Sequence, residues 1–128
     1  MAVIPALAGC GTLDRDAVQT EIQNVASAAA EGSLVAQGVE QDRTFRSFTV
    51  IRTAELHKVA MNASQALRET PAEAGLGAGA RQGADLGDRA AGLLEGLHKR
   101  PTDRRLAHIT RLALDHLATE ARDQADRL

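Results

Sequence analysis

The chain has 128 residues, which is enough for one compact domain and too few for two ordinary ones. Its 15 basic and 17 acidic residues give a net charge of −2, which argues against a protein that binds nucleic acid through a basic surface. The chain is expected to fold because 44% of it is hydrophobic, and its two phenylalanines, without tryptophan or tyrosine, offer no platform for stacking nucleic-acid bases. Its one cysteine, Cys10, excludes an internal disulfide framework and a multi-cysteine zinc site.

The first ten residues carry an apolar run that is too short to span a bilayer, since a spanning helix needs about 20 residues. The run ends in Leu7-Ala8-Gly9-Cys10, which resembles the lipobox of bacterial lipoproteins. The resemblance implies that a diacylglycerol is attached to the Cys10 sulfur, that a signal peptide is cleaved after Gly9, and that Cys10 becomes the acylated N-terminus. Two acyl chains are enough for stable membrane anchoring, whereas one is not.

One feature departs from the lipobox pattern, because a signal peptide should begin with lysine or arginine and the first basic residue here is Arg15. The alternative is that residues 1–12 form a flexible lead-in with an unmodified thiol. The segment 21–36 is similar to small predicted lipoproteins of high-GC Gram-positive bacteria, and the excess of arginine over lysine, 13 to 2, fits that origin. The resemblance implies a location on the extracytoplasmic face of the cell membrane, with the cytoplasm as the alternative, and brings no activity with it.

From residue 13 onward the sequence predicts helices only, because Pro71 and Pro101 stand at boundaries and no segment alternates as a strand does. The first helix is expected over about 13–41, with Thr12 or Asp14 as its cap. Its apolar stripe advances in steps of three and four residues. Gly32 lies on this stripe, where the missing side chain lets another helix approach closely. The stripe comprises Val18, Ile22, Val25, Ala29, Gly32, Ala36 and Val39.

A second helix is expected from residue 42 or 44 to about residue 67. The junction 41–43 contains neither glycine nor proline, so one long continuous helix is the alternative. Arg52 lies near the middle of the apolar face of this second helix. It is expected either to be a buried charge paired with Glu21 or Glu55, or to pack its aliphatic stem on that face and keep its guanidinium in solvent. On a period of 3.6 the expected buried face holds Phe45, Phe48, Leu56, Val59, Ala60, Ala63 and Leu67.

The residues Thr70-Pro71-Ala72-Glu73 have the features of a helix start, namely a threonine cap, a proline in the first turn and a glutamate three residues after the threonine. Four glycines between residues 75 and 83 then predict a frayed or looped connection over about 74–82, since glycine weakens a helix. Regular helix is expected to resume up to about residue 98. Its inward side chains are expected to be Leu86, Ala90, Leu93 and Leu97.

Pro101 ends that helix, and Thr102 or Asp103 caps a last helix. The chain is therefore predicted to be an all-α antiparallel bundle of about four helices, one domain over 13–128 that follows the lead-in 1–12. Because small apolar residues bury little area, we expect the bundle to be slim and modestly stable or to self-associate. The expected inward face of the last helix is Leu106, Ile109, Ala113, Leu117, Ala121 and Leu128.

The sequence holds one motif with the spacing of a metal site, Glu95-Gly-Leu-His98. Di-metal bundles use two such pairs and two further glutamates, and no second pair is present here. We therefore expect an exposed ion-pairing surface, with His116 bordering the core and His108 facing solvent, and we assign no catalytic residue, metal or cofactor. The pairs Gly83–Gly87 and Gly92–Gly96 have the spacing of close helix crossings, and the alternative is that these glycines only weaken the helix.

These patterns predict a membrane-anchored helical lipoprotein that acts without enzymatic activity as an interaction or scaffolding module at the cell envelope. One alternative is a soluble helical module that self-associates or binds a partner helix. Another is a helical metal-binding protein or enzyme that uses Glu95 and His98. The expected partners are the membrane, through a palmitate-bearing Cys10, and an unidentified protein or a second copy of the chain, but not nucleic acid.

Overall fold

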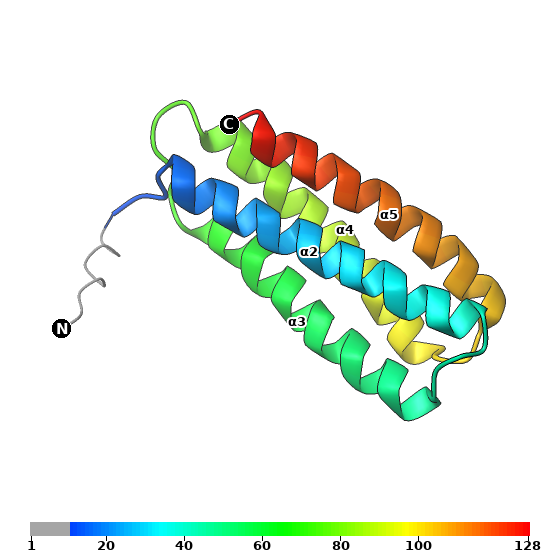
Figure 1. The fold of residues 1–128 in the computed structure, drawn as a ribbon. Coiled ribbons are helices and arrows are strands. Elements are labelled where there is room, and N and C mark those ends of the chain that lie inside the picture. The colour runs from blue at the N-terminus through cyan, green and yellow to red at the C-terminus, as the bar shows by residue number, and fades with distance from the viewer. Residues whose placement is uncertain (1–10) are drawn as a thin grey trace.

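The computed structural model describes residues 11–128, which form an antiparallel all-α bundle (Figure 1). The bundle consists of α2 (Arg15–Glu40), α3 (Arg46–Glu69), α4 (Gly77–Lys99) and α5 (Arg104–Asp126). The predicted fold class is thereby confirmed. None of the helices within residues 11–128 is long and apolar enough to cross a membrane.

The four helices do not form a square bundle. α2 packs against α3, α4 and α5, and α4 in turn packs against α3 and α5. Of the described helices, only α3 and α5 are not in contact, because they lie on opposite sides of the α2–α4 pair. The cross-section is therefore flattened, with α2 and α4 touching across the bundle.

Glycines allow this close approach. A Cβ atom on Gly32 would lie 2.7 Å from Leu94 Cδ2, and one on Gly83 would lie 2.6 Å from Ile22 Cγ1. A Cβ atom on Gly87 would meet α3, with the backbone oxygen of Ala60 only 3.2 Å away. The close crossings expected at Gly32 and at Gly83–Gly87 are confirmed, whereas Gly92 and Gly96 face open space and mark no crossing.

The N-terminal ends of α2 and α5 are capped as the sequence predicts. The Asp14 carboxylate accepts a hydrogen bond of 2.8 Å from the Ala17 N–H, and Asp103 accepts one of 2.9 Å from the Leu106 N–H. Between α2 and α3 the chain turns over residues 41–45, where Asp42 has a φ of 56°. This left-handed conformation breaks the helix, so the alternative of one continuous helix is wrong.

The prediction of a helix start at Thr70 is wrong. The Leu13 N–H donates to the Pro71 carbonyl at 2.7 Å, and the Glu73 N–H donates to the Leu13 carbonyl at 3.0 Å. The Glu73 N–H is therefore held by the chain segment before α2 instead of by a threonine cap. Helix α4 begins only at Gly77, so the irregular connection ends earlier than the expected 74–82.

The buried face of α3 is rotated relative to the prediction in the first half of the helix, whereas Leu56, Ala60, Ala63 and Leu67 are buried as expected. Phe45, Phe48 and Val59 are exposed, and Thr49 and Thr53 are fully buried instead. The buried hydroxyls cost little because they bond to carbonyls of their own helix, as when Thr53 Oγ1 donates to the Thr49 oxygen at 2.7 Å. Thr49 and Thr53 thus face the core in place of Phe45 and Phe48, which the sequence pattern had assigned to it.

The same rotation occurs in the first half of α5. Ile109 is exposed, whereas Thr110 and Leu114 are buried. His116, expected at the core boundary, is exposed as well. In α4 the pattern missed Leu94, which is fully buried, whereas the predicted Leu93 is only partly buried.

Candidate functional site

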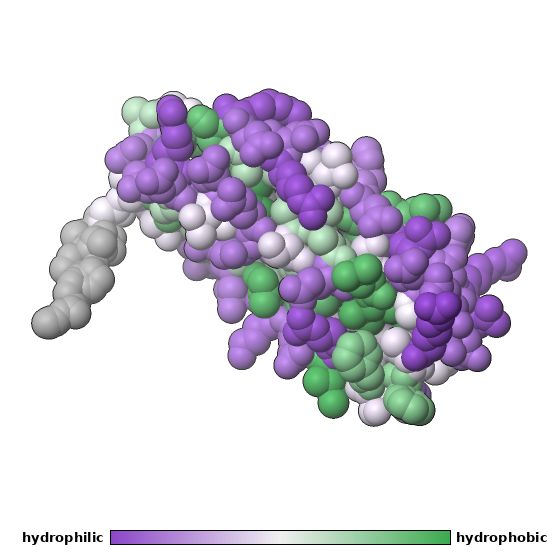
Figure 2. All heavy atoms as spheres, viewed as in Figure 1, coloured by the Kyte–Doolittle hydropathy of each residue, from purple (hydrophilic) through white to green (hydrophobic). Residues whose placement is uncertain are grey.

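The most unusual surface of the bundle is an apolar patch on α2 and α3, near the turn between them (Figure 2). It consists of four large side chains, and it includes both phenylalanines of the chain. A hollow of about 400 Å³ in this region is lined in part by Leu34 and Phe48. The exposed fractions of the patch residues are 67% for Leu34, 82% for Phe45, 49% for Phe48 and 61% for Ile51.

Arg52 lies on the rim of this hollow. Its guanidinium donates to Glu55 at 3.0 Å and forms a second ion pair with Glu31 of α2. The hydrogen bond with Glu55, opposed by desolvation, raises the pKa of Arg52. Since 36% of its side chain is exposed and both partners face solvent, Arg52 is not a buried charge, and Glu21 is not its partner.

A strongly basic surface adjoins the apolar patch. The α2–α3 and α4–α5 turns lie at the same end of the bundle, opposite the start of α2 and the C-terminus (Figure 1). Residues 41–47 and 99–105 contain six basic side chains and two carboxylates, Asp42 and Asp103. All six basic side chains are exposed: Arg43, Arg46, Lys99, Arg100, Arg104 and Arg105.

The last residue of α2, Glu40, connects that helix to α5. Its carboxylate accepts a hydrogen bond of 2.7 Å from Arg111 Nε and another from His108, while its backbone oxygen accepts one from Arg104 at 3.1 Å. The hydrogen bonds from Arg111 and then His108 hold the pKa of the Glu40 carboxyl below its ordinary value. The group thus anchors the C-terminal end of α2.

Glu40→Gln is expected to lower the thermal midpoint of unfolding at neutral pH and to have no effect in strong acid. A carboxyl whose pKa is lower in the folded state stabilises the fold above its unfolded pKa, about 4.3. That contribution is lost as the pH falls through the folded pKa. Thermal denaturation of both proteins over this acidic range measures the effect.

Glu69→Gln is the matched control, because Glu69 is exposed and makes no ion pair among residues 11–128. An equal loss of stability in this control, or a loss in Glu40→Gln that persists in strong acid, would contradict the role given to Glu40.

The predicted Glu95–His98 pair faces His57 of α3 across a small cavity of about 220 Å³. His98 Nδ1 lies 3.0 Å from the Val50 carbonyl, so this nitrogen carries the proton and donates it. Glu95 pairs with Lys99 at 3.2 Å and lies 3.9 Å from His57. Within residues 11–128, no three histidine, cysteine or acidic side chains come together as a metal-binding group.

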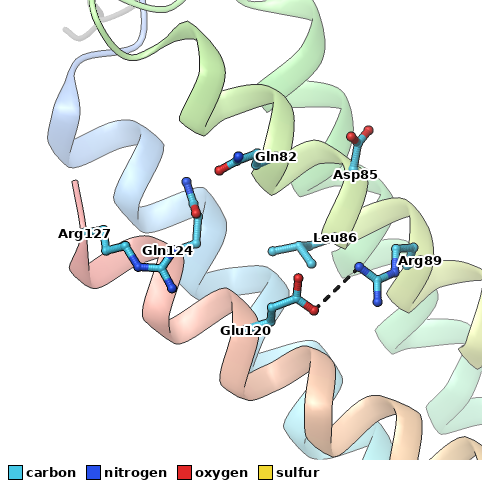
Figure 3. A pocket seen from close by; sticks show the side chains of 7 residues that line it. All are labelled: Gln82, Asp85, Leu86, Arg89, Glu120, Gln124 and Arg127. Carbon is cyan, nitrogen blue, oxygen red and sulfur yellow. Dashed lines mark ion pairs between the residues drawn. The ribbon is translucent and has the colours of Figure 1, made fainter.

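A second hollow, of about 340 Å³, lies between α4 and α5 (Figure 3). Side chains of both helices project into it, and Arg89 of α4 spans it to reach Glu120 of α5 at 3.6 Å. No buried polar side-chain atom of the described residues lacks a hydrogen-bond partner. The lining consists of Gln82, Asp85, Leu86, Arg89, Glu120, Gln124 and Arg127.

The sequence pattern thus missed the apolar patch, because it assigned Phe45 and Phe48 to the core. A usable signal was present. The steps from Thr49 through Thr53 to Leu56 continue the three-and-four spacing of the buried face, and this spacing leaves Phe48 outside it, although Phe45, four residues before Thr49, still fits. The remaining candidate, Cys10, lies outside the described residues.

Comparison of the chain with protein-family models, with curated proteins and with solved structures finds no match.

Proposed function

We propose that this protein is a helical interaction module that is tethered to the extracytoplasmic face of the membrane through Cys10 and docks through the apolar patch. The observation that carries the docking role is the exposure of both phenylalanines, Phe45 and Phe48, in a bundle whose core is built from aliphatic and small side chains. Aromatic side chains contribute most when they are buried. Their placement on the surface therefore favours a binding role over a structural one.

The tether rests on the lipobox-like residues before α2. Leu13 is held by two backbone hydrogen bonds to the α3–α4 connection, and only two residues separate it from Cys10. An acyl group at Cys10 would therefore hold that end of the bundle close to the membrane, within about 10 Å of extended chain. The apolar patch lies toward the other end of α2, whose 26 residues span about 39 Å.

Metabolic labelling tests the tether. Full-length protein expressed in an actinobacterial host is expected to incorporate radiolabelled palmitate, and Cys10→Ser is expected to lose the label completely, because no other cysteine can form the thioether. The label is measured on the purified protein after gel electrophoresis. Equal labelling of the wild type and of Cys10→Ser, or no labelling of either, would refute the tether.

A docking role for the apolar patch is tested separately. Phe48→Ser is expected to leave the thermal midpoint nearly unchanged and to weaken binding at the patch about tenfold. Leu112→Ser, which alters an equally exposed apolar side chain on α5, is the control and is expected to leave binding unchanged. The docking role would be contradicted if Phe48→Ser had the same oligomeric state, the same membrane binding and the same partner binding as the wild type.

A further inference from the structure

The basic end of the bundle, formed by residues 41–47 and 99–105, carries an excess of positive charge. It holds six basic side chains in a chain whose net charge is −2. Arg43, Arg46 and Arg105 make no ion pair within the described part of the chain. An anionic partner would therefore find free guanidinium groups here, which bind phosphate in bidentate geometry.

Three of these cations also stand where a helix disfavours them. Arg46 begins α3, and Arg104 and Arg105 begin α5, although the first turn of a helix favours negative charge. At the start of α3 no negative group offsets the positive charge of Arg46, because the cap residue Phe45 makes no side-chain hydrogen bond and the first turn holds no acidic residue. An anion outside the protein would supply the missing negative charge.

We infer that this end of the bundle binds the surface of a membrane rich in anionic phospholipids. The arginines would contact headgroup phosphates, and the four side chains of the apolar patch would enter the boundary between headgroups and acyl chains. The inference rests on the proposed function in one respect, since it takes the apolar patch as the docking surface. It adds the partner's chemistry and does not depend on acylation of Cys10. Since the two ends of α2 lie about 39 Å apart, a tethered bundle brings both ends to the same membrane by lying along its surface.

Geometry favours a lipid surface over an acidic protein or a nucleic acid. The cations come from the two turns at this end of the bundle, and Phe45, in one of these turns, has 82% of its surface exposed. Mobile headgroups adapt to such a surface without matching its shape. A nucleic acid would contact the cations and leave the apolar patch uncovered.

The test uses full-length protein carrying Cys10→Ser, so that no acyl chain contributes. Binding is measured by sedimentation with vesicles of phosphatidylglycerol and phosphatidylcholine in equal parts, and with vesicles of phosphatidylcholine alone. Arg43→Gln with Arg46→Gln removes two charges from the basic end. Its matched control, Arg15→Gln with Arg122→Gln, removes two exposed arginines that lie toward the opposite end.

The protein is expected to bind the anionic vesicles and to bind phosphatidylcholine far more weakly. The partition coefficient should fall about fivefold for each arginine lost at the basic end, and the control should retain binding. Phe45→Ser and Phe48→Ser should each reduce it about tenfold, whereas Leu112→Ser should not. The substituted arginines, phenylalanines and leucine are all exposed, and unchanged thermal midpoints would verify that the variants fold.

Three results would overturn the inference. The first is equal or absent binding to the two kinds of vesicle. The second is an equal loss in the basic-end variant and in its control, which would indicate unspecific attraction. The third is absence of vesicle binding while Phe48→Ser converts a dimer to a monomer or releases a protein partner, a result that would leave the proposed interaction module standing and reject only its lipid partner.

Discussion

Leu114→Ala is expected to lower the free energy of unfolding by about 2–5 kcal/mol, the range for large-to-small substitutions in a closely packed core. Leu114 is fully buried in α5, and its Cδ1 lies 3.1 Å from the position that a Cβ atom on Gly32 would occupy. The α2 backbone is already as close as a glycine allows, so it cannot fill the cavity by moving inward. Thermal denaturation should show a midpoint lower by about 10–20 °C.

Leu112→Ala is the matched control, because it makes the same chemical change two residues earlier on the same helix. Half of the Leu112 side chain is exposed, so the expected change is within about 0.5 kcal/mol. Ile109→Ala adds a second check, since the sequence pattern assigned Ile109 to the core and the structure exposes it. A large loss at Ile109 with a small loss at Leu114 would show that α5 is rotated differently from the structure.

Gly83→Ala is expected to be less stable than Gly92→Ala by about 1–3 kcal/mol. Both substitutions replace a glycine inside α4, so both gain the same helix propensity, about 1 kcal/mol. At Gly83 the new Cβ atom would lie 2.6 Å from Ile22 Cγ1 and 3.0 Å from Leu67 Cδ1, whereas at Gly92 it meets no atom within 4 Å. The difference between the variants therefore isolates the cost of separating α4 from α2 and α3.

Denaturant unfolding of the two variants and the wild type measures that difference. Gly92→Ala should be more stable than the wild type, because the alanine adds helix propensity without a contact. Equal stabilisation by both substitutions would mean that α4 does not approach α2 as closely as the structure shows.

Local patterns predicted the helices well where their signals lie within one segment. The α2 stripe through Val18, Ile22 and Val25 is fully buried, and Asp14 and Asp103 cap their helices as expected. Such features depend on spacing and on hydrogen bonds between neighbouring residues, so they can be read without knowing what the helix packs against.

The rotation of α3 and α5 was missed because the pattern counted only apolar residues as core and so did not use the spacing of the threonines. Thr49, Thr53 and Thr110 are buried, and Thr53 satisfies its hydroxyl on its own helix. A threonine that does so packs much like valine, whereas a larger side chain such as Phe45 or Ile109 is left at the surface. The candidate site was missed for this same reason.

The amino-acid sequence by itself determined that this protein is a bundle of helices and set most of their ends, since periodicity and capping act over a few residues. Only the tertiary structure decided which side of α3 faces inward, where α4 begins and how closely it approaches α2. Those outcomes depend on contacts between distant segments, such as Leu13 with Glu73 and Gly83 with Ile22, whose packing outweighs the weak local preferences of glycine, threonine and phenylalanine.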